Sequence, residues 1–163
     1  MRVMRMTQNN INTDQIIPGE FLNHLDWASI GKGLFHGEVA ASIPADGEWA
    51  LLSGDNFGCG SSREQAVWAL LARGCRAVVA PSFARIFRRN AVYCGLVVAP
   101  IGEDDWKQLQ AMGSVAQIHI HMDSQQVEVI DSQETGTRFA FALTPFEQYV
   151  LEHGGWLQVA MSA

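Results

Sequence analysis

The stretch GDNFGCGSSREQAVWAL, residues 54–70, places two hydroxyl groups and an arginine between a glycine-rich turn and a run with the pattern of a helix. Ser61 and Glu64 have the S-x-x-E spacing of a capping box, in which the serine oxygen accepts a hydrogen bond from the first turn and the glutamate reaches back. The sequence therefore predicts a helix that begins at Ser61. This structural role leaves Ser62 and Arg63 without an explanation.

A helix N-terminus preceded by glycines, here Gly58 and Gly60, presents free N–H groups and the positive end of the helix dipole to an anion. The stretch has no lysine for a nucleotide P-loop, and it is not a Gly-x-Ser-x-Gly nucleophile elbow. Ser61 at the helix start would be stabilised as an oxyanion, and Arg63 could hold a carboxylate in a bidentate fork. This pattern favours a serine base that removes a proton alpha to a carboxylate. A Lewis acid for a departing hydroxyl would have to come from a partner.

The three cysteines, Cys59, Cys75 and Cys94, have spacings that fit neither a disulfide framework nor the paired-cysteine patterns of metal sites. We expect Cys75 and Cys94 to be buried, and Cys59 lacks an evident histidine partner as a nucleophile. His119 and His121 share one face of a predicted strand, but no third ligand is evident. The sequence predicts no metal bound by this chain.

Composition limits the classes of function. At 163 residues and 48% hydrophobic content, the chain predicts one domain over residues 1–163. The net charge of −6 and the lack of basic runs argue against nucleic-acid binding. No apolar run reaches bilayer length, and the start MRVMRMTQNN has no signal-peptide pattern, so we expect no membrane segment and a cytoplasmic location.

The centre of the chain alternates between strand and helix patterns, which predicts an α/β fold with central parallel strands and flanking helices. The expected elements are a strand at 49–56, a helix from Ser61 to Gly74, a strand at 75–81, a helix that has Ser82 as its N-cap and ends at Gly95, and a strand at 96–101.

The flanking regions differ from this centre. Residues 13–22 predict a strand or turn, and residues 23–48 predict mostly loop. A short surface helix is expected at 103–110. Three alternating runs between 115 and 143 predict an antiparallel C-terminal meander. A capping box at Thr144 and Glu147 predicts a final helix that ends at a double glycine.

Four segments, NTDQIIPGEFL, GDNFGCGSSREQAVWAL, SFARIFRRNAVYCGL and the glycine-ended final helix, occur in an order that resembles the small subunits of 3-isopropylmalate dehydratases. These correspond to the swivel domain of the aconitase family. The resemblance implies a swivelling β/β/α domain that pairs with a large subunit carrying a 4Fe-4S cluster. It also implies a hydro-lyase that is active only after assembly, with no cofactor bound by this chain.

The resemblance also implies roles for single residues. The first serine of the Gly-Ser-Ser-Arg motif is the family's base, which corresponds to Ser61, and Ser62 and Arg63 bind substrate carboxylate. Asp14 falls in the family's Thr-Asp pattern near the site, or else makes an Asx-turn. Arg85 lies in the SFARIF motif and supports the site, or else shares a solvated helix face with Arg88 and Arg89. The supporting positions of the motif are Gly58, Gly60 and Glu64.

Substrate choice is expected from the loop at residues 20–38. Asn23 and His24 stand where family members often carry a basic residue, and we expect both to contact substrate. The candidates are 3-isopropylmalate, a methyl-substituted malate, maleate and homoaconitate. Apolar residues such as Trp27 and Leu34 would suit an isopropyl group or would anchor the loop. A candidate of another class is an anion-binding α/β module without catalysis.

Overall fold

The structure, a computed structural model, describes residues 1–23 and 26–162. Its central sheet is parallel and has the order β1-β2-β3-β4. The strands of this sheet are β1 (Arg2–Met6), β2 (Trp49–Ser53), β3 (Cys75–Ala80) and β4 (Val97–Pro100). Every residue of β2 is buried, as is every residue of β3 except the half-buried Arg76. Continuous apolar runs of this kind belong to strands that are covered on both faces.

A second, antiparallel sheet has the order β5-β6-β7 and consists of β5 (Val115–His121), β6 (Gln126–Asp131) and β7 (Gly136–Ala140). Its inward positions are Ile118, Val127, Val129 and Phe139, all buried. Period-two alternation predicted these strands, and the structure confirms them. β5 packs against β1, and the Ile118 N–H donates to the Met1 carbonyl at 2.9 Å, so the two sheets adjoin.

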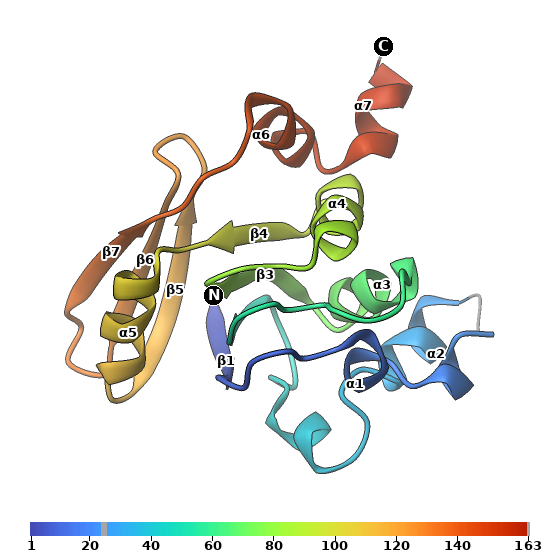
Figure 1. Ribbon diagram of the computed structural model, residues 1–163, viewed down its shortest axis with the longest axis horizontal. Coiled ribbons are helices and arrows are strands. Elements are labelled where there is room, and N and C mark those ends of the chain that lie inside the picture. Colours follow the sequence, from blue (N-terminus) through green and yellow to red (C-terminus); the bar gives the residue numbers. More distant parts are fainter. Residues whose placement is uncertain (24–25, 163) are drawn as a thin grey trace.

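The elements form three layers (Figure 1). The antiparallel sheet and α5 lie on one side of the parallel sheet, and helices α1 to α4 lie on the other. The helices are α1 (Thr13–Ile16), α2 (Trp27–Lys32), α3 (Glu64–Ala72), α4 (Arg85–Tyr93), α5 (Glu103–Ala111), α6 (Pro145–Glu152) and α7 (Trp156–Ser162), with 3-10 turns at Gly19–Phe21 and Glu38–Ser42. The predicted α/β fold with flanking helices and a C-terminal meander is confirmed.

Of the strand or turn predicted at residues 13–22, the structure shows turns and no strand. Residues Thr13–Ile16 form a helical turn because Asn12 accepts from the Gln15 N–H while the Gln15 side chain accepts from the Asn12 N–H. Residues 23–48 also contain more than loop. Asp26 caps α2 by accepting from the Ser29 N–H at 2.9 Å. Helices of one or two turns are too short to show a hydrophobic period, so only their caps indicate them.

Both ends of the chain form elements that the sequence pattern did not predict. β1 is an edge strand with one buried side chain, Met4, and its sequence, RVMRM, lacks the continuous apolar run of a buried strand. α7 buries no residue, and it rests on ring contacts of Trp156 with Tyr93 and Phe146.

Arg88 does not belong to a solvated helix face. It is half buried and pairs with Glu147 at 2.7 Å, which joins α4 to α6. Burial alone would raise the pKa of Glu147, but Arg88 and Thr144 lower that pKa below its ordinary value. The predicted capping box at Thr144 and Glu147 is confirmed. Among the described helices, none is long and apolar enough to cross a membrane.

Candidate active site

The loop after β2 is held by backbone hydrogen bonds on two sides. On one side, the Gly58 N–H donates to the Ile11 carbonyl at 2.8 Å, and the Thr13 N–H donates to the Cys59 carbonyl at 2.9 Å. On the other side, the Phe57 N–H donates to the Ser82 carbonyl and the Phe57 carbonyl accepts from the Ala84 N–H. Because β1, β2 and β3 are parallel, the segments that follow them leave from the same edge of the sheet.

Side chains reinforce this arrangement. The Asn56 amide donates to the Asn10 side chain at 2.8 Å, and both asparagines have left-handed backbones, with φ of 55° and 58°. The Ser82 hydroxyl donates to Asp55 Oδ1 at 2.6 Å and accepts from the Asn56 N–H at 3.0 Å. The prediction that Ser82 caps α4 was therefore wrong. Ala84 occupies that position, and Ser82 instead joins the loop after β3 to the loop after β2.

Two glycines give the loop its shape. Gly58 has a φ of +77°, and a Cβ at this position would lie 2.2 Å from Phe87 Cγ, so only glycine fits. Gly60 has a φ of +94°, and a Cβ there would lie 3.3 Å from Thr13 Oγ1. The loop can therefore pack closely against α1 on one side and the first turn of α4 on the other.

The predicted capping box of Ser61 and Glu64 is wrong. α3 begins at Glu64, its N-cap is Arg63, and no side chain makes the cap hydrogen bond. Glu64 is exposed, and its carboxylate accepts from Cys94 Sγ at 3.3 Å. Ser61 precedes the cap position by two residues and is exposed. Its hydroxyl is thus free of the structural task that the sequence suggested.

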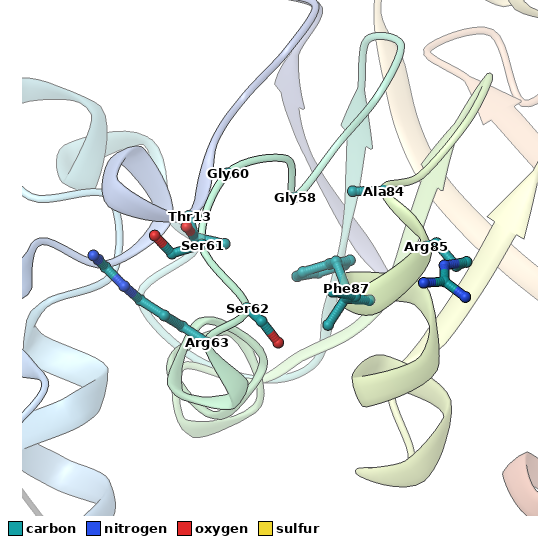
Figure 2. Close-up of a pocket in the computed structure, with 10 residues that line it drawn as sticks. Thr13, Gly58, Gly60, Ser61, Ser62, Arg63, Ala84, Arg85 and Phe87 are labelled. Carbon is teal, nitrogen blue, oxygen red and sulfur yellow. The ribbon is translucent and has the colours of Figure 1, made fainter.

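Ser61 instead lines a pocket of about 200 Å³ (Figure 2). The lining residues are Thr13, Gly58, Gly60, Ser61, Ser62, Arg63, Ala84, Arg85, Ile86 and Phe87. The pocket lies between the N-termini of α3 and α4. The structure describes every residue of these two helices, and at neither N-terminus does the side chain of the N-cap residue make a capping hydrogen bond. First-turn N–H groups and two positive dipole ends therefore face this space, which suits an anion.

The two arginines of the pocket lie at opposite ends, as Figure 2 shows. Arg63 extends toward α1, where its guanidinium forms an ion pair with Asp14. Arg85 lies beyond Phe87, while the Ser62 side chain points into the space between α3 and α4. The Arg63 side chain is 23% exposed and that of Asp14 is 60% exposed, so water reaches the pair. Asp14 does not line the pocket, and its contact with the site is through Arg63.

The remaining predicted positions lie elsewhere. Asn23 is exposed in the turn after the 3-10 helix Gly19–Phe21 and is not part of the pocket wall. His24 lies outside the described residues. Sequence reasoning missed Thr13 and Phe87 as pocket residues. Thr13 could have been noticed beside Asp14 in the same motif, whereas Phe87 gives no signal beyond its place in an apolar run.

Among the described residues, the three cysteines do not come together as the ligands of an iron–sulfur cluster. Burial raises the pKa of the Cys75 thiol to about 12, and this thiol donates to the Ala77 carbonyl. Cys94 is half buried and not fully buried as expected, and its burial, followed by Glu64, raises the pKa of this thiol to about 12. Over residues 1–23 and 26–162, no group of three or more His, Cys, Asp or Glu side chains could hold a metal ion.

The parallel sheet of this chain carries helices on one face and an antiparallel sheet on the other, and the pocket lies at the strand ends. This architecture is that of the swivel-domain class of the aconitase fold. A family model described as the aconitase C-terminal domain matches residues 44–102. A solved structure of 3-isopropylmalate dehydratase from Methanocaldococcus jannaschii is 28% identical, with a TM-score of 0.81 over 99% of this chain and 92% of that chain.

Curated relatives define the family more closely. The 3-isopropylmalate dehydratase small subunit of Roseiflexus castenholzii is 35% identical over 94% of this chain and 80% of its own length. That of Chloroflexus aurantiacus is 40% identical over 89% of this chain and 78% of its own length. The chain belongs to the family of 3-isopropylmalate dehydratase small subunits, which are parts of hydro-lyases. The resemblance found in the sequence motifs is confirmed.

Proposed function

We propose that this chain is the small subunit of a cytoplasmic hydro-lyase that removes water from a hydroxy-diacid and adds it back at the adjacent carbon, with 3-isopropylmalate as the leading substrate. The observation that carries the proposal is the pocket between two uncapped helix N-termini, with two serines and Arg63 in its wall. Such a pocket matches a small molecule with negative charge. Three free cysteines agree with a reducing compartment.

Within this pocket, each residue has a distinct task. Ser61 accepts the proton from the carbon alpha to a carboxylate, and the nearby helix N-termini stabilise its oxyanion form. Ser62 donates a hydrogen bond to a substrate carboxylate. Arg63 binds a carboxylate with its fork of N–H donors, and Asp14 holds the guanidinium in place.

The partner completes the site. Loss of a hydroxyl from the neighbouring carbon is difficult without a Lewis acid, and we assign that role to a 4Fe-4S cluster on the large subunit. The described residues of this chain include no group of side chains that could hold the cluster, so we expect activity only after the two subunits assemble. No nucleic acid or membrane is required by this proposal.

Substrate choice stays with the loop at residues 20–38. Ile30, Leu34 and Phe35 are buried in the core, which makes them loop anchors instead of the wall of an isopropyl pocket. Trp27 is 55% exposed and is the large apolar side chain of α2 that a substrate or partner can reach. Methyl-substituted malates, maleate and homoaconitate therefore stay in the test panel beside 3-isopropylmalate.

The test is an anaerobic assay of this chain with its cluster-loaded large subunit, which follows the absorbance of the new double bond as each diacid is added. Ser61→Ala should assemble normally and lower turnover by several orders of magnitude, about the loss expected for a catalytic base. The matched control is Ser124→Ala, at an exposed serine of the turn between β5 and β6, which should keep wild-type turnover. Near-normal turnover of Ser61→Ala would refute the assignment.

An anion-binding module without catalysis is the competing class. Calorimetric titration of the chain without its partner separates the two. Tight binding of a diacid or a nucleotide by the isolated chain, together with no turnover in the assembled complex, would favour the module.

A further inference from the structure

Thr13 carries a hydroxyl whose burial has no structural explanation. It is the first residue of α1 and is 1% exposed. Among the described residues, the buried side-chain oxygens without a hydrogen-bond partner are Thr13 Oγ1 and Ser53 Oγ. A buried hydroxyl that makes no hydrogen bond destabilises the folded state, so native proteins seldom keep one without a function.

The position of Thr13 suggests that function. Thr13 lines the pocket, whereas Ser53, at the end of β2, does not. The chain from Cys59 to Ser61 passes over Thr13, since the Thr13 N–H donates to the Cys59 carbonyl and a Cβ at Gly60 would lie 3.3 Å from Thr13 Oγ1. Figure 2 draws Thr13 and Ser61 together at the wall of the pocket that both line.

We propose that Thr13 is a positioning residue whose hydroxyl donates a hydrogen bond to the Ser61 oxygen when Ser61 has lost its proton to solvent. The inference rests on the proposed function, in which Ser61 is the base. Ser61 is exposed and directly follows Gly60, whose backbone closely approaches Thr13 Oγ1, whereas the buried Thr13 oxygen is withdrawn from bulk water. A neutral donor to an oxyanion makes a short, strong hydrogen bond. Thr13 thereby favours the form of Ser61 that accepts the substrate proton.

Three variants of the assembled enzyme test this role. Thr13→Val keeps the shape of the side chain and removes the hydroxyl, and it should lower kcat about 100-fold, the loss seen when one donor to an oxyanion is removed. Its KM should change little, and the acidic limb of its kcat profile should move to higher pH because the base is harder to deprotonate. Thr13→Ser restores the donor and should recover kcat to within a few-fold of wild type. Ser53→Ala removes the other unpaired buried hydroxyl and should leave kcat unchanged.

Stability measurements separate positioning from packing. Because the Thr13 hydroxyl makes no hydrogen bond in the folded chain, the unfolding midpoint of Thr13→Val should equal or exceed that of wild type. A lower midpoint together with low kcat, not restored by Thr13→Ser, would show a structural role and overturn the inference. An unshifted acidic limb would overturn it as well.

Ser61→Ala, measured in the same assay, distinguishes a failure of the inference on Thr13 from a failure of the proposed function. If Ser61→Ala is inactive and Thr13→Val retains full kcat, the inference on Thr13 fails while Ser61 remains the base. If Ser61→Ala retains full turnover, the proposed function fails and the inference fails with it.

Discussion

The loop that carries Ser61 and the sheet β5–β7 find their hydrogen-bond partners at different distances along the chain. Asn56 bonds to Asn10, 46 residues away. In the sheet, Arg138 bonds to Glu128, which is 10 residues away. The strands of the sheet pair with the strands next to them in sequence, whereas the loop depends on segments that follow two other strands.

This difference shows what each region can tolerate. A sheet made of neighbouring strands depends on alternation, which many residue types satisfy. The loop depends on particular backbone angles and close approaches, so single residues determine its shape. Substitutions of similar size should consequently have large effects in the loop and small effects in the sheet.

The largest effect is expected for Gly58→Ala. The new Cβ would lie 2.2 Å from Phe87 Cγ at a φ of +77°. Left-handed strain and overpacking together should lower the free energy of unfolding by about 2–5 kcal/mol. Because the loop would have to move, turnover should also fall sharply. Chemical denaturation of the isolated chain and the diacid assay of the complex measure the two effects.

Gly113→Ala is the control for that experiment. No atom lies within 4 Å of a Cβ at Gly113, and its backbone is not left-handed. Its stability and turnover should stay at wild-type values. A Gly58→Ala chain as stable as Gly113→Ala would show that the loop can shift freely, which would remove the contrast between the two regions.

An intermediate effect is expected for Arg63→Lys. Lysine keeps the charge beside Asp14 but lacks the planar fork that binds a carboxylate with two parallel hydrogen bonds. KM should rise about tenfold, on the order of 1.4 kcal/mol of binding, with a smaller change in kcat. Arg138→Lys makes the same replacement in the sheet, where Arg138 pairs with Glu128, and should leave KM unchanged. Equal KM values for the two variants would remove Arg63 from substrate binding.

The same contrast explains which features could be predicted from the sequence. The strands β5, β6 and β7 followed from alternation, and β2, β3 and β4 followed from continuous apolar runs, because burial imposes both patterns. The capping box at Ser61 matched a local spacing, but long-range hydrogen bonds hold the loop and delay the helix to Glu64. The prediction that Ser82 is an N-cap was wrong for the same reason, since the Ser82 hydroxyl donates a hydrogen bond to Asp55 in another loop.

Site residues could be predicted where they are adjacent in one sequence motif, and could not be predicted where only the tertiary fold places them in the pocket. Ser61, Ser62 and Arg63 are adjacent in sequence and line one pocket. Phe87 enters the same pocket only because Gly58 lets the loop approach α4. The ion pair of Asp14 with Arg63 needs α1, a helical turn that the sequence pattern did not indicate.

The smallest effect is expected at Glu128, on the sheet. Hydrogen bonds from His121 and then Arg138 lower the pKa of Glu128 below its ordinary value of 4.5. A carboxyl whose pKa is lower in the folded state stabilises the fold above its unfolded pKa and loses that contribution as the pH falls through the folded pKa. Wild type should therefore be slightly more stable than Glu128→Gln at pH 7, and the difference should shrink as the pH falls below about 4.5.

Urea unfolding of both chains across this pH range measures the difference, with turnover of the assembled enzyme at neutral pH as a second readout. Turnover should be the same for wild type and Glu128→Gln, because the sheet lies on the other side of the parallel sheet from α3 and α4, whose N-termini border the pocket (Figure 1). A stability difference that stays constant with pH would show that Glu128 acts by packing and not by charge. A loss of turnover would show that the sheet supports the site directly, so that the two regions are coupled and the single-residue sensitivity of the loop extends across the fold.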